Sequence, residues 1–382
     1  MVHTPEKVDI HRDFTLLIDG KNAFPEILRC MERAERSIRI NMFIWRDDEI
    51  GNRMAAAALA AADRGVEVEI SVDRYGVVLE KAEECKRSFF HKRQTAVEKV
   101  KTKTLELVYP APGALRKAPD RETALYRAVM SHPRIHVSRD EFKADHSKFY
   151  IFDNEVLILG GINIEDKENG RDLQGRAYQD YMVKLRGRQY VEAFLDRMER
   201  GEPGGGDWFF GANTKGSARR FEMERLYLEM IDGAREELTI TMAYFSPLPV
   251  FLSAIAAAHR RGVQVTVLIP EQANFQSDSN HKAVKKLLQM TDNGITVYRS
   301  PKMVHTKLIA NEEMVSLGST NITKKAFVQL SELNLFVRRR DSAFARSLMD
   351  SVAQEQALAR RVYSWQEIRY RAVLAWLEGF LV

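Results

Sequence analysis

The strongest constraint on the fold is an internal duplication, because two separate parts of the chain follow the same order of segments. Residues 34–45 and 234–245 each leave a helical pattern and enter an alternating apolar pattern typical of a β-strand. Alanine-rich helical segments follow, and a second pair of strand patterns lies at 64–73 and 261–270. A repeated strand–helix–strand unit predicts an α/β protein of two duplicated halves, each a mixed β-sheet flanked by helices and related by pseudo-two-fold symmetry.

The length of the chain agrees with two halves, since 382 residues are too many for one ordinary domain. A glycine-rich stretch at 201–216 lies near the middle and is predicted to be a linker. We therefore expect an N-terminal half at 1–200 and a C-terminal half at 217–382. The first half carries an insertion at about 75–130 that is rich in lysine and arginine. It is either a solvated, partly helical excursion or a basic rim for an anionic substrate or membrane.

Composition narrows the class of protein. Hydrophobic residues make up 45% and charged residues 29%, which is typical of a soluble globular protein with a sizeable core. The only cysteines, Cys30 and Cys85, exclude a disulfide framework and a four-cysteine zinc site. No apolar run reaches the roughly 18–20 residues of a membrane span, so we expect a cytoplasmic protein, peripheral on the cytoplasmic face of the membrane. The net charge of +5 favours anionic partners such as phosphates, acidic lipid surfaces or nucleic acid.

A short motif with chemical potential occurs once in each half. His-x-Lys lies in a strand-like stretch, and an acidic residue follows at the next polar turn. Residues two apart on a strand point to the same face, so each histidine and its lysine are expected to project together. The candidate catalytic residues are His146, Lys148, Asp153, His305, Lys307 and Glu312. Because Asp153 falls at the turn, we interpret it as an anchor for the hairpin backbone rather than as a reacting group.

Polar side chains just past the returning strands complete the set, with Asn163 in the first half and Ser319 and Asn321 in the second. We expect these residues to bind phosphate, because lysine ammonium and amide N–H groups can hold the non-bridging oxygens of a phosphodiester. One imidazole can attack phosphorus, and the other can protonate the leaving oxygen and later deprotonate the incoming nucleophile. No metal or cofactor is expected, since the lysines supply positive charge.

Two buried acids are the candidates for orienting the histidines. A nucleophilic imidazole must be neutral and correctly turned, which usually requires a carboxylate on its other nitrogen. Asp180 and Glu332 lie downstream of the two motifs, in short apolar strands where a buried acid needs a partner. We assign Asp180 to His146 and Glu332 to His305.

The C-terminal segment is amphipathic and basic. Its large apolar residues are Trp365, Ile368, Leu374, Trp376, Leu377, Phe380 and Leu381. Such a segment is predicted to pack on the core, and the alternative is an interfacial helix in an acidic membrane surface.

These residues carry a resemblance to a known family. The chain resembles the phospholipase D superfamily, whose signature His-x-Lys-x4-Asp occurs twice, and Glu312 replaces the second Asp. The resemblance extends from about Phe24 to Val337 and is closest to the bacterial cardiolipin synthase-like branch. The sequence segments that support that branch are FIWRDDEIG (43–51), RGVEVEI (64–70), GGINIED (160–166), YFSP (244–247) and SELNL (331–335).

The resemblance implies both the fold and the chemistry. It implies two α/β halves with both His–Lys pairs in one central cleft, and a phosphohistidine intermediate resolved by an alcohol or by water. In the family the nucleophile is often the N-terminal histidine, which would be His146, with His305 as the acid and base. The residues alone leave that order open.

Three classes of function compete at this point. The first is a phosphatidyltransferase that acts on a phospholipid such as phosphatidylglycerol, resembles cardiolipin synthase and has hydrolysis as a side reaction. The second is a phosphodiesterase acting on nucleic acid with the same catalytic pairs, which the basic charge would suit. The third is a non-catalytic lipid- or phosphate-binding protein, and the two intact His–Lys pairs argue against it.

Overall fold

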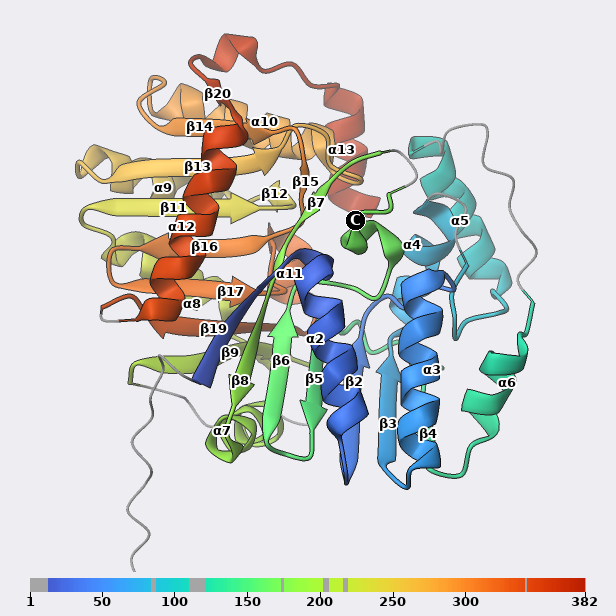
Figure 1. Cartoon of the computed structure of the whole chain (residues 1–382). Helices are drawn as coiled ribbons and strands as arrows, with labels where there is room; N and C mark the ends of the chain where they lie inside the picture. Colours follow the sequence, from blue (N-terminus) through green and yellow to red (C-terminus); the bar gives the residue numbers. More distant parts are fainter. Residues whose placement is uncertain are drawn as a thin grey trace, which may run out of the picture.

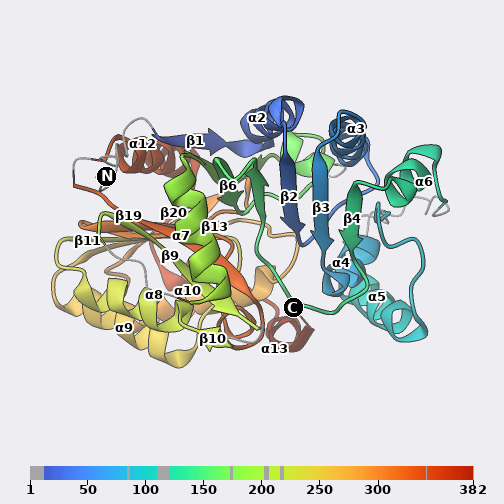
Figure 2. The same cartoon turned by 90° about the horizontal axis from the view of Figure 1, so that it is seen from below.

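Two large β-sheets dominate the computed structural model, which describes residues 13–83, 87–109, 121–172, 175–201, 206–215, 219–340 and 342–381. The sheets lie face to face, and helices cover the outer side of each (Figure 1; Figure 2). Each sheet mixes parallel and antiparallel strands and belongs to one half of the chain. The predicted α/β class with two duplicated halves is confirmed.

The first sheet has seven strands. Their order across the sheet is β1 (Phe14–Ile18), β8 (Tyr181–Arg186), β6 (Val156–Gly160), β5 (Phe149–Phe152), β2 (Ser37–Met42), β3 (Glu67–Val72) and β4 (Ile135–Ser138). Strands β2, β3 and β4 run parallel because crossover segments join them, whereas β5 and β6 form an antiparallel hairpin. The helices packed on the outer face are α2 (Asp19–Arg33), α3 (Glu49–Asp63) and α6 (Ala124–Ser131).

The second sheet repeats this plan and adds strands at its edges. Its order is β10 (Arg220–Phe221), β9 (Trp208–Thr214), β19 (Glu332–Arg338), β17 (Met314–Gly318), β16 (Lys307–Asn311), β11 (Glu237–Met242), β13 (Gln264–Pro270), β14 (Thr296–Ser300) and β20 (Arg360–Val362). The parallel group is now β11, β13 and β14, and the antiparallel hairpin is β16 and β17. The outer helices are α8 (Met223–Gly233), α9 (Pro249–Arg260) and α10 (Ser277–Met290).

A third apolar core joins the inner faces of the sheets. Leucine, valine and aromatic side chains from β8, β6, β17 and β19 meet there and are buried. Helices α7 (Arg188–Glu199) and α12 (Ala343–Leu358) contribute to the same core. Because burying this much apolar surface opposes separation of the sheets, the two halves hold one fixed relation to each other.

Short exchanged pairings also link the halves beside the two motifs. Strand β7 (Tyr178–Gln179) of the first half pairs in parallel with β15 (Met303–Val304) of the second. The equivalent link on the other side is a parallel bridge between Asp145 and Ser331. A further short ladder lies within the second half and joins β12 (Phe245–Ser246) to β18 (Ile322–Thr323). The residue directly before each His-x-Lys motif therefore pairs with a segment of the opposite half.

The predicted linker at 201–216 is partly wrong. Its sequence WFFGANT forms strand β9, which pairs with β19 from Val337 to Glu332. The aromatic side chains Trp208 and Phe210 pack in the core between the sheets, and this packing outweighs the surrounding glycines. The sheet of the second half thus begins before residue 217, inside the predicted linker.

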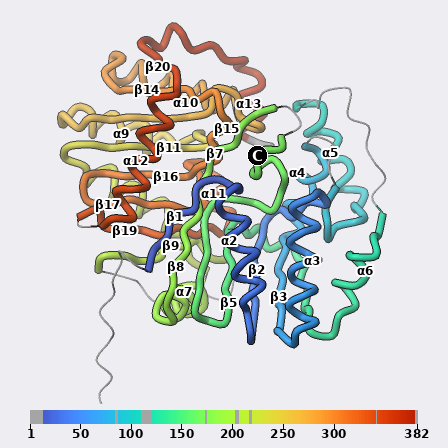
Figure 3. The backbone as a smooth tube through the Cα atoms, viewed as in Figure 1, coloured from blue at the N-terminus to red at the C-terminus, as the bar shows by residue number. Residues whose placement is uncertain are grey.

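The basic insertion forms helices at the edge of the first half (Figure 3). They are α4 (Val77–Ala82), α5 (Ala96–Val108) and α6, and residues 84–86, which include Cys85, and 110–120 lie outside the described residues. Helix α5 starts at a capping box in which Thr95 and Glu98 satisfy each other's backbone amides. The described residues of the insertion are therefore largely helical.

The C-terminal segment packs on the second half. Helix α13 (Ala372–Leu381) lies against α10, where the amide of Ser279 donates to the Glu378 carboxylate at 2.7 Å. Ile368 just before it is buried in the second core, which agrees with the core-packing prediction. The side chains of Phe380 and Leu381 lie outside the described part of the chain. Among the helices that the structure describes, none combines the length and the apolar character needed to cross a bilayer.

Candidate active site

A cavity of about 690 Å³ lies where the two halves meet. Its wall includes His146 and Asn163 from the first half and His305 and Asn321 from the second. All four side chains are buried in the protein and reach this one space. The duplicated fold therefore brings both copies of the motif into a single site.

The backbone holds each motif against the opposite half. The amide of His146 donates to the carbonyl of Ser331 at 2.8 Å, and the amide of His305 donates to the carbonyl of Gln179 at 2.8 Å. Each lysine then begins or precedes a strand of the hairpin, β5 or β16. The histidines are thus fixed at the point where the exchanged ladders end.

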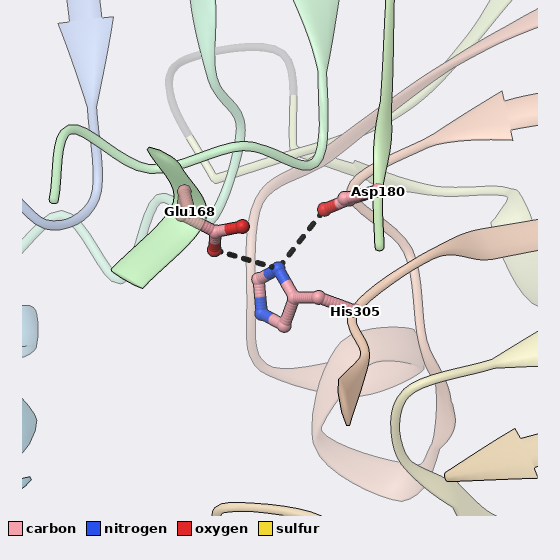
Figure 4. Close-up of side chains that lie close together, drawn as sticks. All are labelled: Glu168, Asp180 and His305. Atoms are coloured by element: carbon pink, nitrogen blue, oxygen red, sulfur yellow. Dashed lines mark hydrogen bonds and ion pairs between the residues drawn. The ribbon is translucent and has the colours of Figure 1, made fainter. Parts of the chain in front are cut away.

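Two carboxylates surround the Nδ1 atom of His305 (Figure 4). Asp180 Oδ2 lies 2.9 Å from this nitrogen and accepts its hydrogen bond, and Glu168 Oε1 lies 3.2 Å from it. Both acids belong to the first half and are buried. With Nδ1 held in this way, Nε2 is the ring nitrogen left for chemistry.

Among the described residues, Glu332 is the carboxylate partner of His146. Its Nδ1 lies 3.2 Å from Glu332 Oε2 and 3.2 Å from the carbonyl oxygen of Ser319. Both partners belong to the second half. The ring also packs edge-on against Phe43, with 4.8 Å between the ring centroids.

The predicted pairing of acids and histidines is therefore wrong, although both acids were identified. Asp180 holds His305, and Glu332 holds His146. The physical reason is the exchange of short ladders, which places each motif beside the acid-bearing strand of the opposite half. Each histidine–carboxylate dyad is built from both halves, so neither half contains a complete one.

Both lysines are buried behind the histidines. The ammonium of Lys148 donates to the carbonyl of His146, and that of Lys307 donates to the carbonyl of His305. Lys307 Nζ also lies 3.9 Å from Asp180 Oδ2. The lysines thus place positive charge beside both dyads.

Burial governs the ionisation of the site. It lowers the pKa of His146 well below the usual value and that of His305 to about 4, and the lysines add to both shifts. Burial also raises the pKa of Glu332 to about 8 and lowers that of Lys148 to about 7. Both imidazoles are consequently kept neutral, which is the state that a nucleophile requires.

The candidate phosphate-binding residues divide into two groups. Asn163 and Asn321 line the cavity, and the Asn163 Oδ1 atom is a buried acceptor without a hydrogen-bond partner among the described residues. The Asn321 Oδ1 atom accepts from the amide of Tyr244 at 3.2 Å, which leaves its NH₂ group for other partners. Ser319, which was also predicted to bind phosphate, does not line the cavity. Its hydroxyl donates to Glu332 instead and fixes the acid that holds His146.

Asp153 and Glu312 do not line the cavity. The Asp153 carboxylate accepts from the amides of residues 35–37 at 2.7–3.0 Å. Glu312 accepts from the amides of residues 235–237 at 2.9–3.3 Å. Burial alone would raise the pKa of each acid, but the amide donors outweigh it and lower both. The anchoring interpretation of Asp153 is confirmed by these contacts, and it extends to Glu312.

Comparison with known proteins agrees with this geometry. The family model described as "Cardiolipin synthase, PLD-like domain" matches residues 27–200 and 227–354. The chain belongs to this family. It is 24% identical over 364 residues to cardiolipin synthase B of Escherichia coli K12, covering 88% of this chain and 78% of that protein. It is also 24% identical over 371 residues to the probable cardiolipin synthase YwiE of Bacillus subtilis 168, covering 90% and 67%.

A solved structure supports the fold of this family member. The phosphatidylserine synthase of Haemophilus influenzae Rd KW20 superposes with a TM-score of 0.69 at 11% identity, covering 96% of this chain and 92% of that one. At that identity the likeness concerns the fold alone. The family match and the two assembled dyads identify the protein as an enzyme of the phospholipase D type.

Sequence reasoning missed Glu168 in this enzyme. It lies within the charged run IEDKE, which resembles a solvated turn, yet η3 (Asp166–Asn169) directs it inward. Burial and the neighbouring Glu165 raise the pKa of Glu168 to about 8. Glu168, Asp180 and His305 are close enough together to form a cation site. Here Nδ1 is already hydrogen-bonded and Lys307 supplies the positive charge, so the cluster fits an orienting role for the histidine.

Proposed function

We propose that this enzyme transfers a phosphatidyl group from a phospholipid such as phosphatidylglycerol to an alcohol, as in cardiolipin synthesis, with hydrolysis as a side reaction. The observation that carries the proposal is the pair of crossed dyads in one cavity. Two oriented neutral imidazoles and two buried ammonium groups match the needs of phosphodiester chemistry.

The proposed reaction has two balanced steps. In the first, Nε2 of one histidine attacks phosphorus, a P–N bond forms and the P–O bond to the leaving alcohol breaks. The second histidine gives its proton to the departing oxygen. In the second step the acceptor alcohol attacks phosphorus, its proton passes to the second histidine, and the P–N bond breaks. With water as acceptor, the same steps give phosphatidic acid.

The surroundings of the histidines support His146 as nucleophile and His305 as acid and base. An acid and base must carry a proton for part of the cycle, and nearby negative charge stabilises an imidazolium. His305 faces Asp180 and Glu168, whereas in the described part of the chain Glu332 is the one carboxylate paired with His146. A phosphate that enters the cavity brings negative charge, which offsets the lysines and raises the pKa of His305.

The cavity wall favours a lipid over the alternative, a nucleic acid. Apolar side chains line much of it: Phe43, Ile44, Val78, Leu79, Leu105 and Phe275. Acyl chains gain free energy by contact with such a wall, about 0.8 kcal/mol for each buried CH₂. Lysines also line the wall, Lys101, Lys167 and Lys325, but the apolar side chains outnumber them, whereas a nucleic-acid groove is expected to place cations along the whole path of the backbone.

Incubation of the purified protein with phosphatidylglycerol vesicles, followed by mass spectrometry of the lipids, tests the proposal. We expect cardiolipin and glycerol, or phosphatidic acid where water competes. A parallel incubation with single-stranded DNA tests the nucleic-acid alternative, and one with EDTA and a soluble diester tests whether a divalent ion is needed. Cleavage of DNA with unchanged lipid would overturn the proposal.

A further inference from the structure

Helix α5 of the insertion presents an apolar face to solvent. Val97, Val100 and Leu107 are 65%, 65% and 84% exposed. The opposite face of the helix carries Glu98 and Leu105, which are buried against the protein. A helix of a soluble protein ordinarily turns its apolar side inward, so these outward residues need an explanation.

The helical positions of these residues form a stripe bordered by cations. At 100° per residue, Val97, Val100 and Leu107 fall on one side of the helix. Exposed lysines flank that stripe on both sides: Lys99 and Lys103 on one, Lys101 on the other. An apolar stripe between lysines is the pattern of a helix that lies in the headgroup layer of an anionic bilayer. The lysine stems can cover apolar surface while their ammonium groups reach lipid phosphates.

The stripe is continuous with the active-site cavity. Val97, Val100 and Lys101 are part of the wall that also includes both histidines. Phe142, from the loop before the first motif, is 61% exposed and lines the same cavity. Lys325 lies on the wall as well, and Lys101 is close enough to lower its pKa, after burial as the larger cause. The mouth is therefore apolar with a cationic rim.

This helix has no equivalent across the pseudo-two-fold axis. It lies in the connection from β3 to β4, residues 73–134, whereas the matching connection from β13 to β14 is residues 271–295 and carries α10. Helix α10 is covered by α13. The exposed stripe is thus an addition on one side of the mouth and does not result from the duplication.

We propose that the outer face of α5 docks the enzyme on an anionic phospholipid bilayer and aligns the cavity mouth with the headgroups. Val97, Val100 and Leu107 enter the boundary between headgroups and acyl chains, and Lys99, Lys101 and Lys103 contact lipid phosphates. A lipid then moves along the apolar wall until its phosphodiester reaches the histidines. This inference deepens the proposed function, because it states how a membrane lipid is presented to that site.

The test compares vesicle binding with turnover of two substrates. The variants are Leu107→Asp and the double variant Lys99→Gln/Lys103→Gln. The control is Val250→Asp, which places the same charge at an exposed apolar residue on α9. Each protein is sedimented with vesicles of phosphatidylglycerol and phosphatidylcholine and with phosphatidylcholine alone. Turnover is measured on the mixed vesicles and on bis(p-nitrophenyl) phosphate, a soluble diester.

We expect Leu107→Asp to lower both the affinity for mixed vesicles and the ratio of vesicle to soluble-diester turnover by at least about tenfold. Each lysine removed should lower the affinity about fivefold at low salt. Val250→Asp should match the wild type in every assay. Wild-type binding by Leu107→Asp would overturn the docking inference.

The remaining outcomes separate this inference from the proposed function. A wild-type enzyme that does not sediment with mixed vesicles also overturns docking and indicates a protein partner for the α5 face. If the wild-type enzyme binds vesicles through α5 but leaves every phospholipid unchanged, the proposed reaction is contradicted and the docking inference still holds.

Discussion

The two histidine sites share the same set of contacts to the motif residues, but the side chains just outside that set differ. Each histidine has a carboxylate from the opposite half on Nδ1, a lysine on its own carbonyl and an asparagine nearby on the cavity wall. The site of His305 adds Glu168, and the residue at the matching place in the second half is Ala326. The site of His146 has the Ser319 hydroxyl on its acid instead.

Local packing accounts for part of this difference. Gly161 occupies the position of Ser319 in the first half, where a Cβ atom would lie 2.3 Å from Asp180 Oδ2. The shorter aspartate therefore requires glycine beside it, whereas the longer Glu332 leaves room for a hydroxyl that orients it. The two dyads were built by one duplication, and the residues just outside the motif now give the histidines different electrostatic surroundings.

The largest expected effect comes from removing either imidazole. His146→Ala and His305→Ala should each lower phospholipid turnover by at least about a thousandfold, or about 4 kcal/mol of transition-state free energy, because the histidines act as one unit. A bis(p-nitrophenyl) phosphate substrate sharpens the comparison, since its leaving group needs no proton. With it, His305→Ala should still form a trapped phosphoenzyme and His146→Ala should not, as mass spectrometry after an alkaline quench would show, because a P–N bond to histidine is labile in acid. The opposite pattern would reverse the roles of the two histidines.

The crossed dyads predict the next effect. Asp180→Asn and Glu332→Gln should each lower phospholipid turnover about a hundredfold, or ~2.7 kcal/mol, by releasing Nδ1 of a histidine. Asp180 holds the proposed acid and base. The loss of turnover caused by Asp180→Asn should therefore be smaller with the nitrophenyl substrate, whose leaving group needs no proton. The loss caused by Glu332→Gln should remain, since Glu332 holds the proposed nucleophile. Equal losses with both substrates would show that the two dyads do not differ in role.

The sequence was sufficient to identify the residues of these dyads but not to predict which acid pairs with which histidine. The histidines, lysines and acids could be identified because they lie at matching offsets in a duplicated chain. Their pairing could not, because it depends on which half each short ladder joins, and that contact is long-range. The partner of the Ser319 hydroxyl could not be predicted from sequence for a similar reason, since a serine that follows a strand can contact either a ligand or a neighbouring acid. Aromatic packing between the sheets likewise placed strand β9 in a stretch whose glycines indicate a linker.

Glu168 tests the main difference between the sites. Glu168→Gln keeps the shape and removes the carboxyl that can ionise beside His305 when the imidazole is protonated, so turnover should fall about tenfold and far less than in Asp180→Asn. The raised pKa of Glu168, about 8, means that the folded state binds more protons than the unfolded state between its ordinary value and pH 8. Its burial therefore destabilises the fold increasingly as pH rises through that window. The Tm of Glu168→Gln should exceed that of wild type at pH 8 and approach it at pH 5, by calorimetry across that range. A fixed Tm difference at all pH values would mean that Glu168 is not buried as a titrating acid.

The smallest effect is expected at the turns, where the halves differ by one methylene. Asp153 and Glu312 each accept from successive backbone amides on the side of the hairpin away from the cavity. Glu312→Asp shortens the reach to amides that already lie at 2.9–3.3 Å, so one bond should weaken at a cost of about 1 kcal/mol in unfolding free energy. Turnover should change by less than about tenfold, because the carboxylate touches neither histidine. Glu332→Ala provides the contrast, since it removes a dyad acid and should abolish most activity with both lipid and soluble substrates. A rise of orders of magnitude in Glu312→Asp would mean that the turn acid controls the position of His305, and the anchoring role common to both halves would then be wrong for the second.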